Sequence, residues 1–88
     1  MVLTLMIVNE KGLHARASAK FVETVESFDA EAEVTKDGMT VAGNSIMGLM
    51  MLAASKGTQI EVEVTGTQSQ DLGEALKSLV ADYFGEGK

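Results

Sequence analysis

Two stretches of the chain alternate almost strictly between apolar and polar residues. Residues 30–36 read AEAEVTK and residues 59–65 read QIEVEVT, so that alanine, valine and isoleucine fall on one side and the glutamates on the other. Successive side chains of a strand point to opposite faces, and this pattern therefore predicts strands with one buried and one solvated face. Such strands are typical of an antiparallel sheet that is covered on one side only.

Two further strands follow from the same reasoning. Residues 2–8 also alternate and predict the first strand of the chain. Asp37-Gly38 follows residues 30–36 and predicts a two-residue hairpin turn, because glycine accepts the positive φ that such turns need. A short strand over residues 39–42 completes the hairpin.

Three stretches show the three- and four-residue spacing of amphipathic helices. The first covers about residues 15–27, the second follows residue 45 and stops at Lys56-Gly57, and the third covers about residues 69–84. Helix N-caps are usually small polar residues whose side chains accept a backbone hydrogen bond. The expected N-caps are Asn44 or Ser45 for the second helix and Thr67 or Ser69 for the third.

The order of these elements is strand, helix, strand, strand, helix, strand, helix. It predicts an α+β fold, an open-faced two-layer sandwich in which three helices cover one face of a four-stranded antiparallel sheet. At 88 residues we expect a single domain over residues 1–88. Disorder is expected, if anywhere, only in the final residues 85–88.

Composition excludes several classes of function. The chain has no cysteine, which removes disulfides and thiolate metal sites and is typical of a reducing compartment, so we expect it in the cytoplasm. A formal charge of −6 argues against a nucleic-acid partner. The apolar first eight residues are too short to span a bilayer, so we expect no membrane insertion. One histidine with scattered carboxylates gives no metal-ligand spacing, and we expect neither a metal nor a cofactor.

The stretch NEKGLHARASAKF places His14, the only histidine, at the expected start of the first helix. Unpaired backbone N–H groups and the positive end of the helix dipole meet there and favour an anion. The positive charge of Arg16 is not stabilised by that dipole, but its planar guanidinium can bind an anion through paired hydrogen bonds. Both features disfavour a protonated ring, so His14 is predicted to be a neutral nucleophile that can hold a phosphoryl group covalently. The alternative is a surface histidine with no chemical role.

The motif GLHAR followed by ASAKFV, and NSIMGLMMLAASKG further along, resemble the histidine-containing phosphocarrier (HPr) family of the phosphoenolpyruvate-dependent phosphotransferase system. The resemblance covers essentially the whole chain and implies four antiparallel strands with three helices. It also implies that His14 accepts a phosphoryl group on Nδ1 from phosphorylated enzyme I and passes it to a histidine of an enzyme IIA domain. Arg16 would neutralise the phosphoryl oxygens, and backbone N–H groups at the start of the helix, including that of Arg16, would add hydrogen bonds.

Ala17 departs from the family pattern, which usually has proline after the arginine. Proline has no N–H, whereas alanine retains one. We therefore predict that the Ala17 amide contacts the phosphoryl group.

The second motif, SIMGLM, contains a serine and several apolar residues, and two interpretations are open for each. Ser45 is either an N-cap alone or, as the resemblance implies, also a regulatory site phosphorylated by an HPr kinase/phosphorylase. Ile46, Met47 and Met50 are either core residues or, as the resemblance implies, an exposed face that docks onto several partners.

The resemblance favours a monomeric phosphocarrier of sugar uptake and its regulation, which is itself a phosphorylated intermediate and not an enzyme acting on free substrate. One alternative is the nitrogen-branch carrier of the same family, NPr. Another is a regulatory binding module that is controlled by Ser45 and in which His14 is idle.

Overall fold

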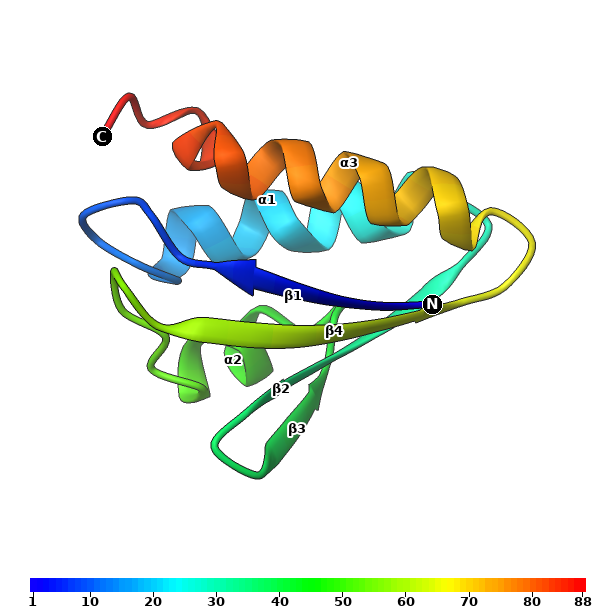
Figure 1. The fold of residues 1–88 in the computed structure, drawn as a ribbon, viewed down its shortest axis with the longest axis horizontal. Coiled ribbons are helices and arrows are strands. Elements are labelled where there is room, and N and C mark those ends of the chain that lie inside the picture. The colour runs from blue at the N-terminus through cyan, green and yellow to red at the C-terminus, as the bar shows by residue number, and fades with distance from the viewer.

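The computed structural model describes residues 1–88 and confirms the predicted α+β sandwich (Figure 1). The elements, in chain order, are β1 (Val2–Met6), α1 (Ala15–Glu26), β2 (Glu31–Lys36), β3 (Met39–Ala42), α2 (Ile46–Met51), β4 (Gln59–Thr65), α3 (Ser69–Ala81) and a short 3₁₀ helix, η1 (Tyr83–Gly85). The four strands form one antiparallel sheet in the order β1-β4-β2-β3. None of the helices combines the length and the apolar character needed to cross a membrane.

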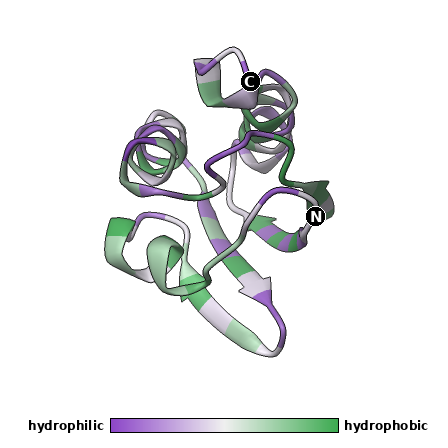
Figure 2. Ribbon diagram, turned by 90° about the vertical axis from the view of Figure 1, so that its left-hand side faces the viewer, coloured by the Kyte–Doolittle hydropathy of each residue, from purple (hydrophilic) through white to green (hydrophobic).

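The alternation of residues along the strands decides which face of the sheet is covered. Every second residue of β4 is buried and the others are exposed. In the register of β2 and β4, Val34 lies opposite Val62 on the covered face, whereas Glu33 lies opposite Glu63 on the open face. The hydropathy colours of Figure 2 show the same alternation along the strand ribbons. Like charges directly opposite each other destabilise a sheet, so the open face is not optimised for stability.

Helices α1 and α3 lie against each other over the covered face, and α2 contacts α1 and β3 (Figure 1). The largest fully buried side chains include Phe21 of α1, Leu72 and Leu76 of α3, and Phe84 of η1. Complete burial of a side chain of this size stabilises the fold by roughly 1.5–3 kcal/mol. The amphipathic faces predicted from spacing are therefore the faces that form the core.

The predicted hairpin between β2 and β3 is confirmed. Asp37 and Gly38 have φ values of 50° and 82°, and positive φ at both central residues is the type I′ geometry that matches strand twist. On the open face, the hydroxyls of Thr35 and Thr40 lie 2.7 Å apart as a cross-strand hydrogen bond.

Helix α2 is shorter than predicted, because it ends at Met51 and does not continue to Lys56-Gly57. Ala53 has a φ of 52°, which a helix cannot contain. The carbonyl of Ala54 accepts a hydrogen bond from the Leu13 amide at 2.9 Å, and the Gly57 amide donates to the Ile7 carbonyl at 2.7 Å. Leu52 and Ala53 still donate hydrogen bonds to the last turn of α2, but Ala54 and Gly57 are bonded to the β1–α1 region.

The last helix begins at Ser69 as predicted, but its N-cap residue and its C-terminal end differ from the prediction. Its N-cap is Gln68, not Thr67 or Ser69, and the Gln68 side chain accepts a hydrogen bond from the Asp29 amide at 2.7 Å instead of capping the helix. At the other end α3 stops at Ala81, and Tyr83 and Phe84 adopt φ values of 58° and 53°. This left-handed turn redirects the C-terminal residues.

Candidate functional site

The backbone around His14 forms the start of α1. His14 is the N-cap residue, and its carbonyl accepts a hydrogen bond from the Ser18 amide at 2.8 Å, while its side chain does not cap the helix. The amides of Ala15, Arg16 and Ala17 have no backbone or side-chain acceptor. The predicted arrangement is therefore present: an imidazole lies beside a helix N-terminus whose free N–H groups favour an anion.

Gly12 fixes the position of the loop that precedes His14. Its φ is +66°, and a Cβ added there would lie 2.4 Å from the carbonyl oxygen of Ala54. The same carbonyl accepts the Leu13 amide, so the loop before His14 is pressed against the segment after α2. Only glycine combines that backbone conformation with that close approach.

The ring of His14 is accessible from solvent, with 28% of its side chain exposed. It borders an open hollow of about 280 Å³, to which α2 contributes Met50. The hollow is lined by Lys11, Leu13, His14, Met50, Ala53, Ala54 and Ser55. A protein that covers Met50 is therefore close enough to reach His14.

A carboxylate that the sequence did not indicate contacts His14. Oε2 of Glu86 is paired with Nε2 of the imidazole, and Oε1 of the same carboxylate accepts a hydrogen bond from Nδ2 of Asn9 at 3.0 Å. Asn9 is fully buried, and its Nδ2 also donates to the Gly12 carbonyl at 2.9 Å. Figure 1 shows the C-terminal end of the chain at the same end of the molecule as the β1–α1 loop.

The C-terminal segment that carries Glu86 is anchored, so the expectation of disorder is wrong for this residue. Phe84 is fully buried, and its carbonyl accepts a hydrogen bond from Nζ of Lys20 at 2.8 Å. The Glu86 amide donates to the Tyr83 carbonyl at 2.9 Å. The segment folds back because Phe84 adds to the core, which the helical spacing of residues 69–84 did not reveal.

The environment of Glu86 shifts its ionisation. Burial raises the pKa of its carboxyl, but the hydrogen bonds from His14 and Asn9 and the nearby charges of His14 and Lys11 together outweigh burial and bring the pKa below its usual range. Glu86 is thus a carboxylate throughout the neutral range.

This lowered pKa predicts an acid-sensitive contribution to stability. A carboxyl whose pKa is lower in the folded state stabilises the fold above its unfolded pKa, about 4.3, and loses that effect as the pH falls through the folded pKa. We expect the difference in unfolding free energy between the wild type and Glu86→Gln to shrink as the pH falls below about 4.3. Urea unfolding measured across this range tests it, and a difference that grows on acidification contradicts it.

Arg16 is exposed and has no acidic partner. The only ion pairs in the structure are His14 with Glu86 and Lys36 with Asp37. Since no carboxylate holds it, the Arg16 guanidinium is available for an anion at the start of α1.

The second motif forms a surface next to this site. Ser45 is the N-cap of α2, as predicted, and its Oγ accepts a hydrogen bond from the Gly48 amide at 3.0 Å. Ile46, Met47 and Met50 are 40%, 73% and 42% exposed, so the alternative that they are core residues is wrong. Met51 extends the surface, and in Figure 2 the α2 ribbon is hydrophobic along most of its length. We call Ile46, Met47, Met50 and Met51 the α2 patch.

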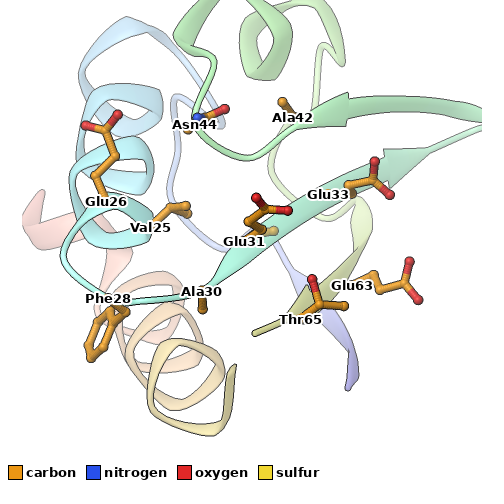
Figure 3. Close-up of a pocket in the computed structure, with 11 residues that line it drawn as sticks. Val25, Glu26, Phe28, Ala30, Glu31, Glu33, Ala42, Asn44, Glu63 and Thr65 are labelled. Carbon is orange, nitrogen blue, oxygen red and sulfur yellow. The ribbon is translucent and has the colours of Figure 1, made fainter. Parts of the chain in front are cut away.

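The largest hollow of the surface, about 520 Å³, is at the opposite end of α1 from His14 (Figure 3). Glu31, Glu33 and Glu63 stand around it on β2 and β4, while Val25 of α1 and Phe28 of the connection to β2 also line it. These carboxylates do not converge into a group that could hold a metal ion. Of these two hollows, only the smaller one is bordered by His14.

Sequence reasoning missed Asn9 and Glu86. Glu86 is 72 residues from His14 and belongs to no motif or periodic stretch, while Asn9 opens the stretch that contains His14 but shows no pattern that would assign it a role. The Gly85-Glu86-Gly87 sequence is typical of a flexible chain end. Only the burial of Phe84 in the structure shows that this segment is anchored.

Comparison with known proteins agrees with this geometry. A family model described as "PTS HPr component phosphorylation site" matches residues 3–82. The chain is 54% identical over 82 residues to the phosphocarrier protein HPr of Neisseria meningitidis, covering 93% of this chain and 92% of the relative. It is 43% identical over 79 residues to the phosphocarrier protein NPr of Escherichia coli, covering 89% and 84%.

A solved structure supports the same assignment. The crystal structure of HPr-C-His from Thermoanaerobacter tengcongensis superposes with a TM-score of 0.93 at 37% identity, over 98% of this chain and 97% of that chain. The full-length match in sequence and fold, with the histidine at the start of α1, shows that the chain is a member of the HPr family.

Proposed function

We propose that this protein is a phosphocarrier in which Nδ1 of His14 is the phosphoryl acceptor. The observation that carries the proposal is the start of α1, where a solvent-accessible imidazole lies beside three amides without acceptors and beside the unpaired Arg16. The amides and the guanidinium supply positive potential for the phosphoryl oxygens. The open hollow suits a carrier, because a sealed pocket would hold the phosphoryl group too tightly to release it.

The proposed transfer is a direct exchange of a phosphoryl group between two histidines. The lone pair of His14 Nδ1 attacks the phosphorus of a donor phosphohistidine, and a new N–P bond forms as the donor N–P bond breaks. The electron pair of the broken bond returns to the donor ring, and the His14 ring becomes positively charged until the phosphoryl group leaves. In the second transfer phosphorylated His14 is the donor, and its N–P bond breaks as a new N–P bond forms on the next histidine.

The family assignment supports the partners of this relay. We propose phosphorylated enzyme I as the donor and an enzyme IIA domain as the acceptor, both docking on the α2 patch next to His14 as the cytoplasmic monomer meets each in turn. Flexible methionines on such a surface adapt to partners of different shape. The higher identity to HPr, 54% against 43% for NPr, favours the sugar-uptake branch over the nitrogen branch.

The proposal is tested by incubating the protein with phosphoenolpyruvate, magnesium and enzyme I. We expect one phosphate per chain that is labile in acid and stable in base, as a phosphohistidine is. Intact mass before and after acid treatment measures it. If no acid-labile phosphate forms, the protein is not a carrier, and the regulatory module in which His14 is idle becomes the supported function.

Ala17 gives a prediction about the lifetime of the phosphorylated form. Its amide has no acceptor in the structure, so Ala17→Pro removes a free donor without breaking a helix hydrogen bond, and the fold is expected to persist. Loss of a hydrogen bond to a charged group, worth roughly 1.5–3 kcal/mol, is expected to shorten the phosphohistidine lifetime by about tenfold. Phosphate release followed by mass measures it, and an unchanged lifetime refutes the contact.

Ser45 gives a prediction about regulation. Aspartate also caps helices well and is favoured at a helix N-terminus, so Ser45→Asp is expected to fold normally. Its charge lies at the start of the α2 patch, and we expect phosphoryl transfer from enzyme I to slow by about tenfold.

The matched control is Ser78→Asp, which adds the same charge to an exposed residue of α3. Initial rates of transfer from enzyme I are compared at equal ionic strength. If Ser45→Asp accepts the phosphoryl group as fast as Ser78→Asp, charge at Ser45 does not regulate docking.

A further inference from the structure

The contact between Glu86 and His14 determines which ring nitrogen is free. An ionised carboxylate can only accept hydrogen bonds, so its partner Nε2 must carry a proton. Whenever the ring is neutral it carries a single N–H, which this contact places on Nε2, so the lone pair is then on Nδ1. No protein group is hydrogen-bonded to Nδ1. The ring is held in the tautomer that exposes a nucleophile on Nδ1.

The carboxylate is itself oriented by a buried side chain. Nδ2 of Asn9 binds Oε1 of Glu86 and the Gly12 carbonyl, so it connects the C-terminal segment to the loop before His14. Oδ1 of Asn9 is buried without a hydrogen-bond partner, which costs roughly 1–3 kcal/mol. The hydrogen bonds that Nδ2 donates to Glu86 and to the Gly12 carbonyl explain why the Asn9 amide is buried there despite this cost.

We propose that Glu86 is a positioning residue of the phosphoryl transfer, and that it directs the phosphoryl group to Nδ1 of His14 by keeping the proton on Nε2. This inference deepens the proposed function and rests on it. When the N–P bond forms at Nδ1, the ring keeps its Nε2 proton and becomes positively charged. The carboxylate then faces that charge, in the way that a buried aspartate supports the histidine of a serine-protease triad.

Other charged groups near the pair do not replace this role. Lys11 acts on Glu86 through its charge, Arg16 lies in the first turn of α1 without a carboxylate partner, and Lys20 is bonded to the Phe84 carbonyl. Glu10, in the same loop as Asn9, is exposed and has no hydrogen-bond partner. Glu86 is the only carboxylate that contacts the ring.

The test uses phosphoramidate, a small phosphoryl donor that needs no partner protein. Attack by a ring nitrogen forms the N–P bond and releases ammonia, and NMR of ¹⁵N-labelled histidine identifies which nitrogen was phosphorylated. We expect the wild type to give Nδ1-phosphohistidine alone. Glu86→Ala is expected to give a mixture of the Nδ1 and Nε2 products and to react at Nδ1 about tenfold more slowly.

Three variants separate positioning from other effects. Glu86→Gln keeps an acceptor oxygen without the charge, and we expect it to retain the Nδ1 product at a reduced rate. Glu86→Asp restores the charge and is expected to recover part of the rate. Glu10→Ala removes a carboxylate that does not touch the ring, and its product and rate should equal those of the wild type.

Two outcomes overturn the inference. One is an unchanged single product and rate in Glu86→Ala, and the other is an equal effect of Glu10→Ala. Thermal unfolding of each variant verifies that the reaction is measured on folded protein. Because no enzyme I is present, a wild type that shows the expected Nδ1 selectivity here but accepts nothing from enzyme I contradicts the phosphocarrier function and not the role of Glu86.

Discussion

Replacing His14 with alanine is expected to abolish the acid-labile phosphate completely while leaving the fold intact. His14 is the only histidine of the chain, and no cysteine is present to serve as a substitute nucleophile. The side chain is not part of the core and does not cap α1, so its removal costs little beyond the contact with Glu86. The loss of activity is thus expected without a large loss of stability.

Intact mass after incubation with phosphoenolpyruvate and enzyme I measures the effect. Ser45→Ala serves as the matched control, because it removes the other candidate phosphorylation site and is expected to retain the acid-labile phosphate in full. Acid-labile phosphate on the His14→Ala variant would show that another group is the acceptor.

Replacing Phe84 with alanine is expected to cause the largest loss of stability among the changes considered. Phe84 is fully buried where η1 meets the core, and phenylalanine-to-alanine changes in cores cost about 3–5 kcal/mol. Domains of this kind are stable by only about 5–15 kcal/mol, so a considerable fraction would be lost. The change also removes the anchor of the C-terminal segment, and we expect the contact between Glu86 and His14 to be lost with it.

Tyr83→Ala is the matched control, because Tyr83 is the neighbouring aromatic residue, shares the positive φ and is exposed. Urea unfolding gives the two stabilities, and we expect Tyr83→Ala to lose less than about 1 kcal/mol. Equal losses for the two variants would show that the turn conformation, and not the burial of Phe84, holds the segment.

The sheet could be predicted from sequence because each strand carries its own pattern. The bounds of β4 and β3 agree with the prediction, and Asp37-Gly38 forms the expected turn, since these features depend on neighbouring residues alone. The placement of His14 and Arg16 at the start of α1 is local in the same way. Their presence in one motif made their common position at the start of α1 predictable.

The remaining features depend on contacts between distant segments. Helix α2 ends early because the Ala54 carbonyl is bonded to Leu13, which no local propensity encodes. Gln68 replaces the expected serine or threonine caps because its side chain bonds Asp29 across a turn. Glu86 reaches His14 only because the chain reverses at Phe84, so the carboxylate of the site could not be found before the fold was known.

The glutamates of the uncovered side of the sheet have a consequence for the molecule in concentrated solution. A bare sheet surface is a natural place for a second copy to stack, yet Glu33 and Glu63 face each other there with Glu31 and Glu61 close by on the same strands. Two such surfaces repel each other within a screening length of about 8 Å at physiological ionic strength. This repulsion disfavours the stacking of two molecules through their open sheet faces in concentrated solution. Added salt weakens the repulsion.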